Sequence, residues 1–196
     1  MKQVLAQKGT QIVMGLLDNM SNKNTDNLEK TLNAQTILQD FCENDHCFNI
    51  LTTPEALLKL ITICCEGESN RMNLPYALNL LHTIITEFSN TDKEISDERK
   101  LEIQSLFAKY FPDMAYNCIL ILQPSNTDSQ YVNQTQMSVE RIGTARIRAI
   151  ELLKTLVLTA TKIKDGKHLI SVLLKSKIID TMLQMIKRYP FACVSH

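Results

Sequence analysis

The sequence predicts an all-α protein built from stacked helix pairs, in the class of HEAT/armadillo-like helical-repeat solenoids. Apolar residues recur at the three- and four-residue spacing of a helix face along almost the whole chain. The 196 residues include only 5 Gly and 5 Pro, too few for a fold that needs many tight turns. No segment of four or more residues alternates convincingly as an amphipathic strand does. We expect one domain over residues 1–196.

In the first half of the chain, four apolar stripes predict four helices. The first stripe ends at a polar stretch over 21–26, in which Thr25 or Asp26 is suited to cap the next helix. The third helix has a strong start signal at 53–55, where a capping threonine precedes a proline and an acid. A second proline start lies at Pro75. The four stripes occupy residues 12–20, 28–41, 57–64 and 78–88.

A further helix begins at Ser96, and we expect Pro112 to interrupt it before a short apolar helix over 114–122. Residues 123–137 are rich in Ser, Asn, Gln and Thr and contain a proline, which predicts a flexible loop.

Ser138 then begins the longest and most apolar helix, whose stripe is wide enough to contact neighbours on two sides. After a turn at 165–166, two last helices are expected at 167–175 and 177–189. The helix pairs repeat about every 40 residues, which is within the HEAT/armadillo range.

The charges are divided along the chain, although Lys+Arg 21 and Asp+Glu 21 balance. From Ser138 onward there are 11 basic and 4 acidic residues, a net charge of +7, so the preceding part with 10 and 17 carries −7. This division could steer an acidic partner to the basic end, or could reflect ordinary solvated helix faces. Nucleic acid is a poor candidate partner, because the basic end lacks an RNA-binding aromatic motif and zinc-finger spacing.

The cysteines predict a reducing compartment. The N-terminal segment is too polar for a secretory signal, so the six Cys residues are expected to be free thiols of a cytoplasmic protein, with the nucleus as the alternative. No run of about 18 apolar residues occurs, so we expect no membrane insertion. Cys42, His46 and Cys47 could be three metal ligands, but no fourth follows at a familiar spacing and structural zinc requires four. We therefore expect no metal site.

No motif in the sequence indicates catalysis. The phosphate-binding loop, the dinucleotide-binding glycine pattern, the nucleophile elbow and the zinc-protease motif are missing. His82 falls among apolar helix residues, where a hydrogen-bonded core histidine is expected rather than a general base. Cys64 and Cys65 have no neighbouring base or cation in the sequence to activate a thiolate. We expect no catalytic residue and no cofactor, and therefore not an enzyme.

Two segments carry a resemblance to a known family. The first is Arg141-Ile142-Gly143-Thr144-Ala145-Arg146-Ile147-Arg148-Ala149-Ile150-Glu151-Leu152-Leu153, and the second is Tyr189-Pro190-Phe191-Ala192-Cys193-Val194-Ser195-His196. They resemble the patterns Pro-Leu-Gly-x-x-Arg-Leu-x-x-Val-Glu-Leu-Leu and Tyr-x-Phe/Trp-Asn-Asn-x-Leu-His of the SAPS-domain family, the regulatory subunits of protein phosphatase 6 and its close relatives. Residues 33–40 are a weaker match to the same family. The chain departs from the pattern at Arg141, where the family has proline, and at 192–193, where it has two asparagines.

The resemblance implies a function in protein recognition. It implies a non-catalytic regulatory or scaffold subunit that binds a protein phosphatase 6-type Ser/Thr phosphatase catalytic subunit and directs it to substrates. Ankyrin-repeat or other substrate-adaptor proteins are further partners that it implies. The family domain is longer, so the chain would correspond to its later part. The alternative is a general helical-repeat protein–protein adaptor without a phosphatase partner.

The candidate partner-binding residues all lie in the two matched segments. Arg146 has two open interpretations: it ties one helix pair to the next through carbonyls or a carboxylate, or it contacts a partner. For Tyr189 and Phe191 an anchoring role in the core is favoured over a partner contact. The complete set of candidates is Arg141, Gly143, Arg146, Arg148, Glu151, Tyr189 and Phe191.

Overall fold

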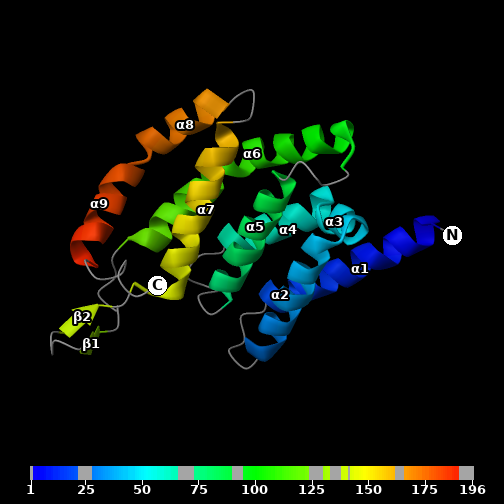
Figure 1. Ribbon diagram of the computed structural model, residues 1–196, viewed down its shortest axis with the longest axis horizontal. Coiled ribbons are helices and arrows are strands. Elements are labelled where there is room, and N and C mark those ends of the chain that lie inside the picture. Colours follow the sequence, from blue (N-terminus) through cyan, green and yellow to red (C-terminus); the bar gives the residue numbers. More distant parts are fainter. Residues whose placement is uncertain are drawn as a thin grey trace.

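Helices form most of the structure (Figure 1). The computed structural model describes residues 2–21, 28–65, 73–89, 95–123, 130–132, 138–140, 142–161 and 166–189. The described helices are α1 (Lys2–Ser21), α2 (Leu28–Glu43), α3 (Asp45–Leu51), α4 (Pro54–Cys65), α5 (Leu74–Phe88), α6 (Asp97–Leu122), α7 (Thr144–Ala160), α8 (Gly166–Lys175) and α9 (Ile178–Arg188). The prediction of an all-α architecture is confirmed at this level.

The helix starts follow local signals in most places. Ser96 caps α6, since its hydroxyl accepts a hydrogen bond from the Arg99 N–H at 3.3 Å. Helix α4 begins at Pro54 as expected, but the Thr53 hydroxyl is buried without a hydrogen-bond partner, so the predicted side-chain cap is wrong. At this helix start, Thr53 bonds to the helix only through its backbone carbonyl, which accepts a hydrogen bond from the Leu57 N–H.

Helix α3 was not expected from the sequence. Its start is capped by Asn44, whose side chain accepts a hydrogen bond from the Cys47 N–H at 3.1 Å. The helix has seven residues and buries Phe48 and Leu51, which places two large apolar groups in the core. A helix this short shows too few turns for a periodic apolar stripe to be recognised.

The prediction that Pro112 interrupts a helix is wrong, because the 26-residue helix α6 continues through it. A proline removes one backbone hydrogen bond and crowds the preceding turn, which destabilises a helix without necessarily ending it. Here Phe111, Met114 and Ala115 are all buried, so both sides of the proline are held against the core. Helix α6, and not the helix after it, is therefore the longest of the described helices.

A small hairpin precedes α7. Strands β1 (Gln130–Val132) and β2 (Ser138–Glu140) pair antiparallel, with Tyr131 opposite Val139. Strand β1 lies inside the predicted loop 123–137, and Ser138 belongs to β2 instead of beginning a helix. Strands of three residues are too short to show an alternating pattern in the sequence. The rest of that loop, 124–129 and 133–137, lies outside the described residues.

Helix α5 lies at the centre of the packing. It contacts α2, α4 and α7, and it buries residues around much of its circumference. Helix α7 packs on α5 and α6, as its wide apolar stripe predicted. Helices α8 and α9 then follow one another along the outer side of α7 (Figure 1), with α8 packed on α6 and α7 and α9 packed on α6 and α8.

Among the described residues, no single helix has the length and apolar composition needed to cross a bilayer. Helices α3 and α4 meet that test only when they are counted together across the 66° bend between them.

The orientation of α7 can be tested by the same substitution at two positions. Leu153 is 2% exposed and Leu158 is 53% exposed. We expect Leu153→Ala to lower the free energy of unfolding by about 2–5 kcal/mol, because it leaves a cavity in the core. The matched Leu158→Ala should cost less than about 0.5 kcal/mol. Urea denaturation of both variants measures the difference, and equal losses would mean that α7 is turned differently.

Candidate protein-interaction surface

Arg146 lies at the junction between the end of α6 and the start of α7. The residue is only 9% exposed. Its Nε donates to the Ile121 carbonyl at 3.2 Å, and its Nη2 donates to the Gln123 carbonyl at 3.1 Å. Its Nη1 donates to the Ile142 carbonyl at 3.2 Å, one turn earlier in the chain. The guanidinium therefore joins two helices through backbone oxygens.

The surroundings of Arg146 compensate its buried charge. The last carbonyls of a helix lack partners within that helix and carry the negative end of its dipole, so a cation at the end of α6 is favourable. On another side, the Tyr189 ring lies 5.4 Å from the guanidinium carbon, within range of a cation–π interaction. Tyr189 is itself 4% exposed and follows α9 directly. The end of α9 is thereby connected to the same junction.

The structure places two of the candidate partner-binding residues in the interior. Arg146 and Tyr189 are buried and contact each other. The geometry agrees with the interpretations in which Arg146 ties helices together and Tyr189 anchors the core. Arg141 and Phe191 lie outside the described residues.

The remaining candidates lie at or near the surface of α7. Gly143 is exposed at the start of the helix with φ 78°, a left-handed conformation that L side chains rarely adopt. A Cβ there would meet nothing within 4 Å, so the backbone angle alone requires glycine. Arg148 donates to Glu151 at 2.7 Å, with side chains 36% and 38% exposed. Surface pairs of this kind contribute less than about 1 kcal/mol to stability.

His82 is half-buried on α5, near the charged face of α7. Burial lowers the pKa of the imidazole below 6.5, and the charges of Arg148 and Lys154 act in the same direction. The opposing influence of Glu151 is smaller than that of burial. The sequence predicted a hydrogen-bonded core histidine at His82, and only the packing of α5 on α7 brings these charges close to it.

Three thiols lie close enough to influence one another at α4 and α6. Burial is the main cause that raises the pKa of Cys118 to about 12 and the pKa of Cys65 to about 11. Burial also raises the pKa of Cys64. The thiols therefore stay protonated near neutral pH, and those of Cys64 and Cys118 fill the core. Within the ranges that the structure describes, no group of three or more His, Cys, Asp or Glu side chains could hold a metal ion.

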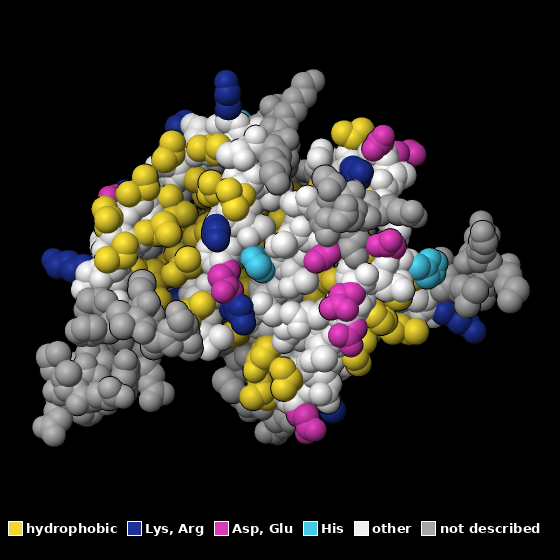
Figure 2. Space-filling view, viewed as in Figure 1, with side chains coloured by type: hydrophobic (Ala, Val, Ile, Leu, Met, Phe, Trp, Pro, Cys, Tyr) yellow, Lys and Arg dark blue, Asp and Glu magenta, His cyan; other side chains and the backbone are white. Residues whose placement is uncertain are grey.

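A large apolar surface lies on α7, α8 and α9. Figure 2 shows apolar side chains gathered over these three helices, with Lys and Arg side chains around them. Soluble proteins rarely expose a contiguous apolar surface larger than a few hundred Å² unless it binds something. We call this surface the α7–α9 apolar face. Its exposed fractions are 37% for Val157, 53% for Leu158, 60% for Leu174, 53% for Ile179, 37% for Met182, 60% for Leu183 and 66% for Ile186.

The sequence did not predict this face. A signal was present in α9, whose apolar residues form one stripe of roughly 160°, wider than the roughly 100° that a single buried stripe requires. The pattern alone cannot say which part of such a stripe is covered, since that depends on where neighbouring helices lie.

The comparisons with known proteins give no match: no protein-family model, no curated protein and no solved structure aligns with the chain.

The Arg146 junction predicts a large loss of stability from a conservative change. In Arg146→Lys a single ammonium cannot reach carbonyls on three sides, so about 1.5–3 kcal/mol of the free energy of unfolding should be lost. Arg148→Lys, two residues along the same helix, is the matched control and should cost less than about 1 kcal/mol. Chemical denaturation of the two variants measures both effects. A harmless Arg146→Lys would show that the junction does not depend on the guanidinium.

The lowered pKa of His82 predicts a loss of stability in mild acid. The unfolded chain binds a proton at this histidine near pH 6.5, whereas the folded protein binds it only at lower pH. Above pH 6.5 His82 therefore does not lower the free energy of unfolding. As the pH falls from there through the lower folded pKa, His82 lowers it progressively. The free energy of unfolding of His82→Gln should decline less over this window than that of the unsubstituted chain. His46→Gln is the control for the substitution itself, because it makes the same change at an exposed position.

Proposed function

We propose that this chain is a non-catalytic regulatory or scaffold subunit that binds a protein phosphatase 6-type Ser/Thr phosphatase catalytic subunit and directs it to substrates. The observation that carries the binding role is the α7–α9 apolar face, where seven large side chains are each more than a third exposed. A scaffold of side-by-side helices suits such a role, because a HEAT/armadillo-like solenoid offers an extended surface for another protein.

The choice of a phosphatase as partner depends on the SAPS-like segments. The Gly and the Arg of the first family pattern correspond to Gly143 and Arg146, and both residues have structural roles in this fold. Gly143 supplies the backbone angle before α7, and Arg146 joins α6 to α7. Their roles support a shared fold more directly than a shared contact, because neither residue needs a partner to explain it. The partner contact is better assigned to exposed side chains.

Capture of the phosphatase tests the proposal. A tagged chain should co-purify with the phosphatase catalytic subunit well above the level recovered by an unrelated helical-repeat protein. The double variant Leu174→Ser and Leu183→Ser should lose most of this recovery, because it makes two side chains of the apolar face polar. Ile12 and Leu101 are 56% and 67% exposed on α1 and α6, so their double change to Ser is the matched control.

Recovery equal to that of the unrelated protein would contradict the phosphatase assignment. If mass spectrometry of the captured material identifies other proteins, and their capture depends on Leu174 and Leu183, the chain is a general adaptor instead.

A further inference from the structure

Helix α9 has two apolar flanks, and only one of them is covered. The inner flank consists of Ile178, Thr181 and Met185, which are buried. The outer flank contains four large side chains that are 37–66% exposed. These four residues are Ile179, Met182, Leu183 and Ile186. Their spacing of i, i+3, i+4 and i+7 is the spacing by which one helix packs along another.

One more helix would fit beside the outer flank in the same side-by-side arrangement as the helices of this protein. Helix α9 packs on α6 and α8, and both contacts lie on its inner side. Leu174 of α8 is 60% exposed and extends the same surface toward the preceding helix. Another helix placed there would contact α9 as the other helices of this protein contact their neighbours.

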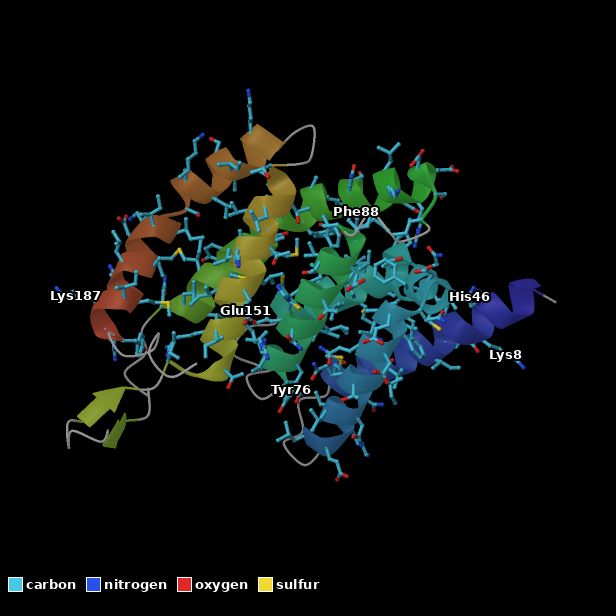
Figure 3. The ribbon with its side chains drawn as sticks, viewed as in Figure 1. Lys8, His46, Tyr76, Phe88, Glu151 and Lys187 are labelled. Atoms are coloured by element: carbon cyan, nitrogen blue, oxygen red, sulfur yellow. The ribbon has the colours of Figure 1, made fainter. Side chains whose placement is uncertain are left out.

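The charges around the outer flank are mainly basic. Helices α8 and α9 with the turn between them contain five basic residues and one acidic residue, Asp180. Asp180 and Leu183 both line an open hollow of about 730 Å³ between α9 and Gln123 at the end of α6. Lys187 projects outward from α9 (Figure 3). The exposed lysines of α7 to α9 are Lys154, Lys167, Lys175, Lys177 and Lys187.

This charge distribution favours some partners over others as the molecule that covers the outer flank of α9. A second copy of the chain that docked through the same face would bring the same lysines to the contact and would be repelled. A partner with acidic residues beside its apolar stripe would be attracted. Membrane-surface helices carry Trp, Phe or Leu on their apolar face. This flank has no aromatic residue and contains a Met, a residue favoured at protein-binding surfaces.

We propose that the outer flank of α9, together with Leu174, docks an amphipathic helix of a partner protein that carries acidic side chains along its apolar stripe. The inference rests on the proposed function in protein recognition and names the chemistry of the partner segment. The partner helix lies along α9, with its apolar side chains between Ile179 and Ile186 and its carboxylates near Lys175 and Lys187.

Two synthetic helical peptides test the proposal on the full chain. Both carry Leu at the same heptad positions, and the flanking positions are Glu in one and Lys in the other. Fluorescence anisotropy should show that the Glu peptide binds at least about ten-fold more tightly than the Lys peptide, with an affinity that falls as salt is added.

Substitutions in the chain make the test specific to α9. The double change Ile179→Ser and Leu183→Ser should weaken the Glu peptide by about ten-fold or more. The matched double change Ile12→Ser and Leu101→Ser should not. Lys175→Glu with Lys187→Glu should reverse the preference toward the Lys peptide. This reversal is a gain of binding, which an unfolded variant cannot produce.

Four results would overturn the inference: no binding of either peptide, equal binding of both, a dimer in sedimentation that Leu183→Ser dissociates, or binding to phosphatidylserine vesicles without binding to the Glu peptide. The proposed function fails separately. If the Glu peptide binds as expected and no phosphatase is captured, the docking surface stands and only the phosphatase assignment is lost. If the phosphatase is captured and the peptides do not bind, the α9 docking inference is lost.

Discussion

The arrangement of the C-terminal helices depends on one buried cation. Arg146 donates to carbonyls at the end of α6 and before α7, and it lies against the Tyr189 ring after α9. Removing a charge from water is costly, so such a residue is tolerated only where its hydrogen bonds are satisfied and oppositely signed dipoles surround it. Three helix ends thereby meet at one side chain. Their relative positions determine which side of α9 faces the core and which side faces outward.

The two parts of this region have different tasks. Arg146 and Tyr189, which lie in the segments that resemble the SAPS pattern, belong to the internal frame, whereas the exposed apolar side chains lie on α8, α9 and the outer side of α7. A frame that is stable without a partner can present a preformed apolar surface, which reduces the entropy lost on binding. In the proposed function, Gly143, Arg146 and Tyr189 therefore maintain the fold, and the outer flank of α9 makes the contact.

The helical content could be predicted because the apolar spacing and the helix-start residues are local properties of the chain. Ser96 and Pro54 mark helix starts where they were expected, while the continuity of α6 through Pro112 was not foreseen. A proline costs the helix the same lost hydrogen bond whether the helix ends there or continues. What decides between them is the burial of Phe111 and Met114 on both sides of it, which is a long-range effect. The short helix α3 and the hairpin β1–β2 were not predicted, because α3 is too short to show the apolar spacing of a helix and the strands are too short to show an alternating pattern.

The sequence by itself determined the helical periodicity, the concentration of basic residues toward the C-terminal end and the positions of Gly143 and Arg146 in a recognisable segment. Only the tertiary structure decided that Arg146 is buried, that His82 lies near the charges of α7 and that half of the α9 stripe remains uncovered. The physical reason is that side-chain spacing specifies what a helix can bury, whereas exposure and pKa depend on which other helices reach it. Ile121 and Tyr189 are distant from Arg146 in the sequence and contact it only after the chain has folded.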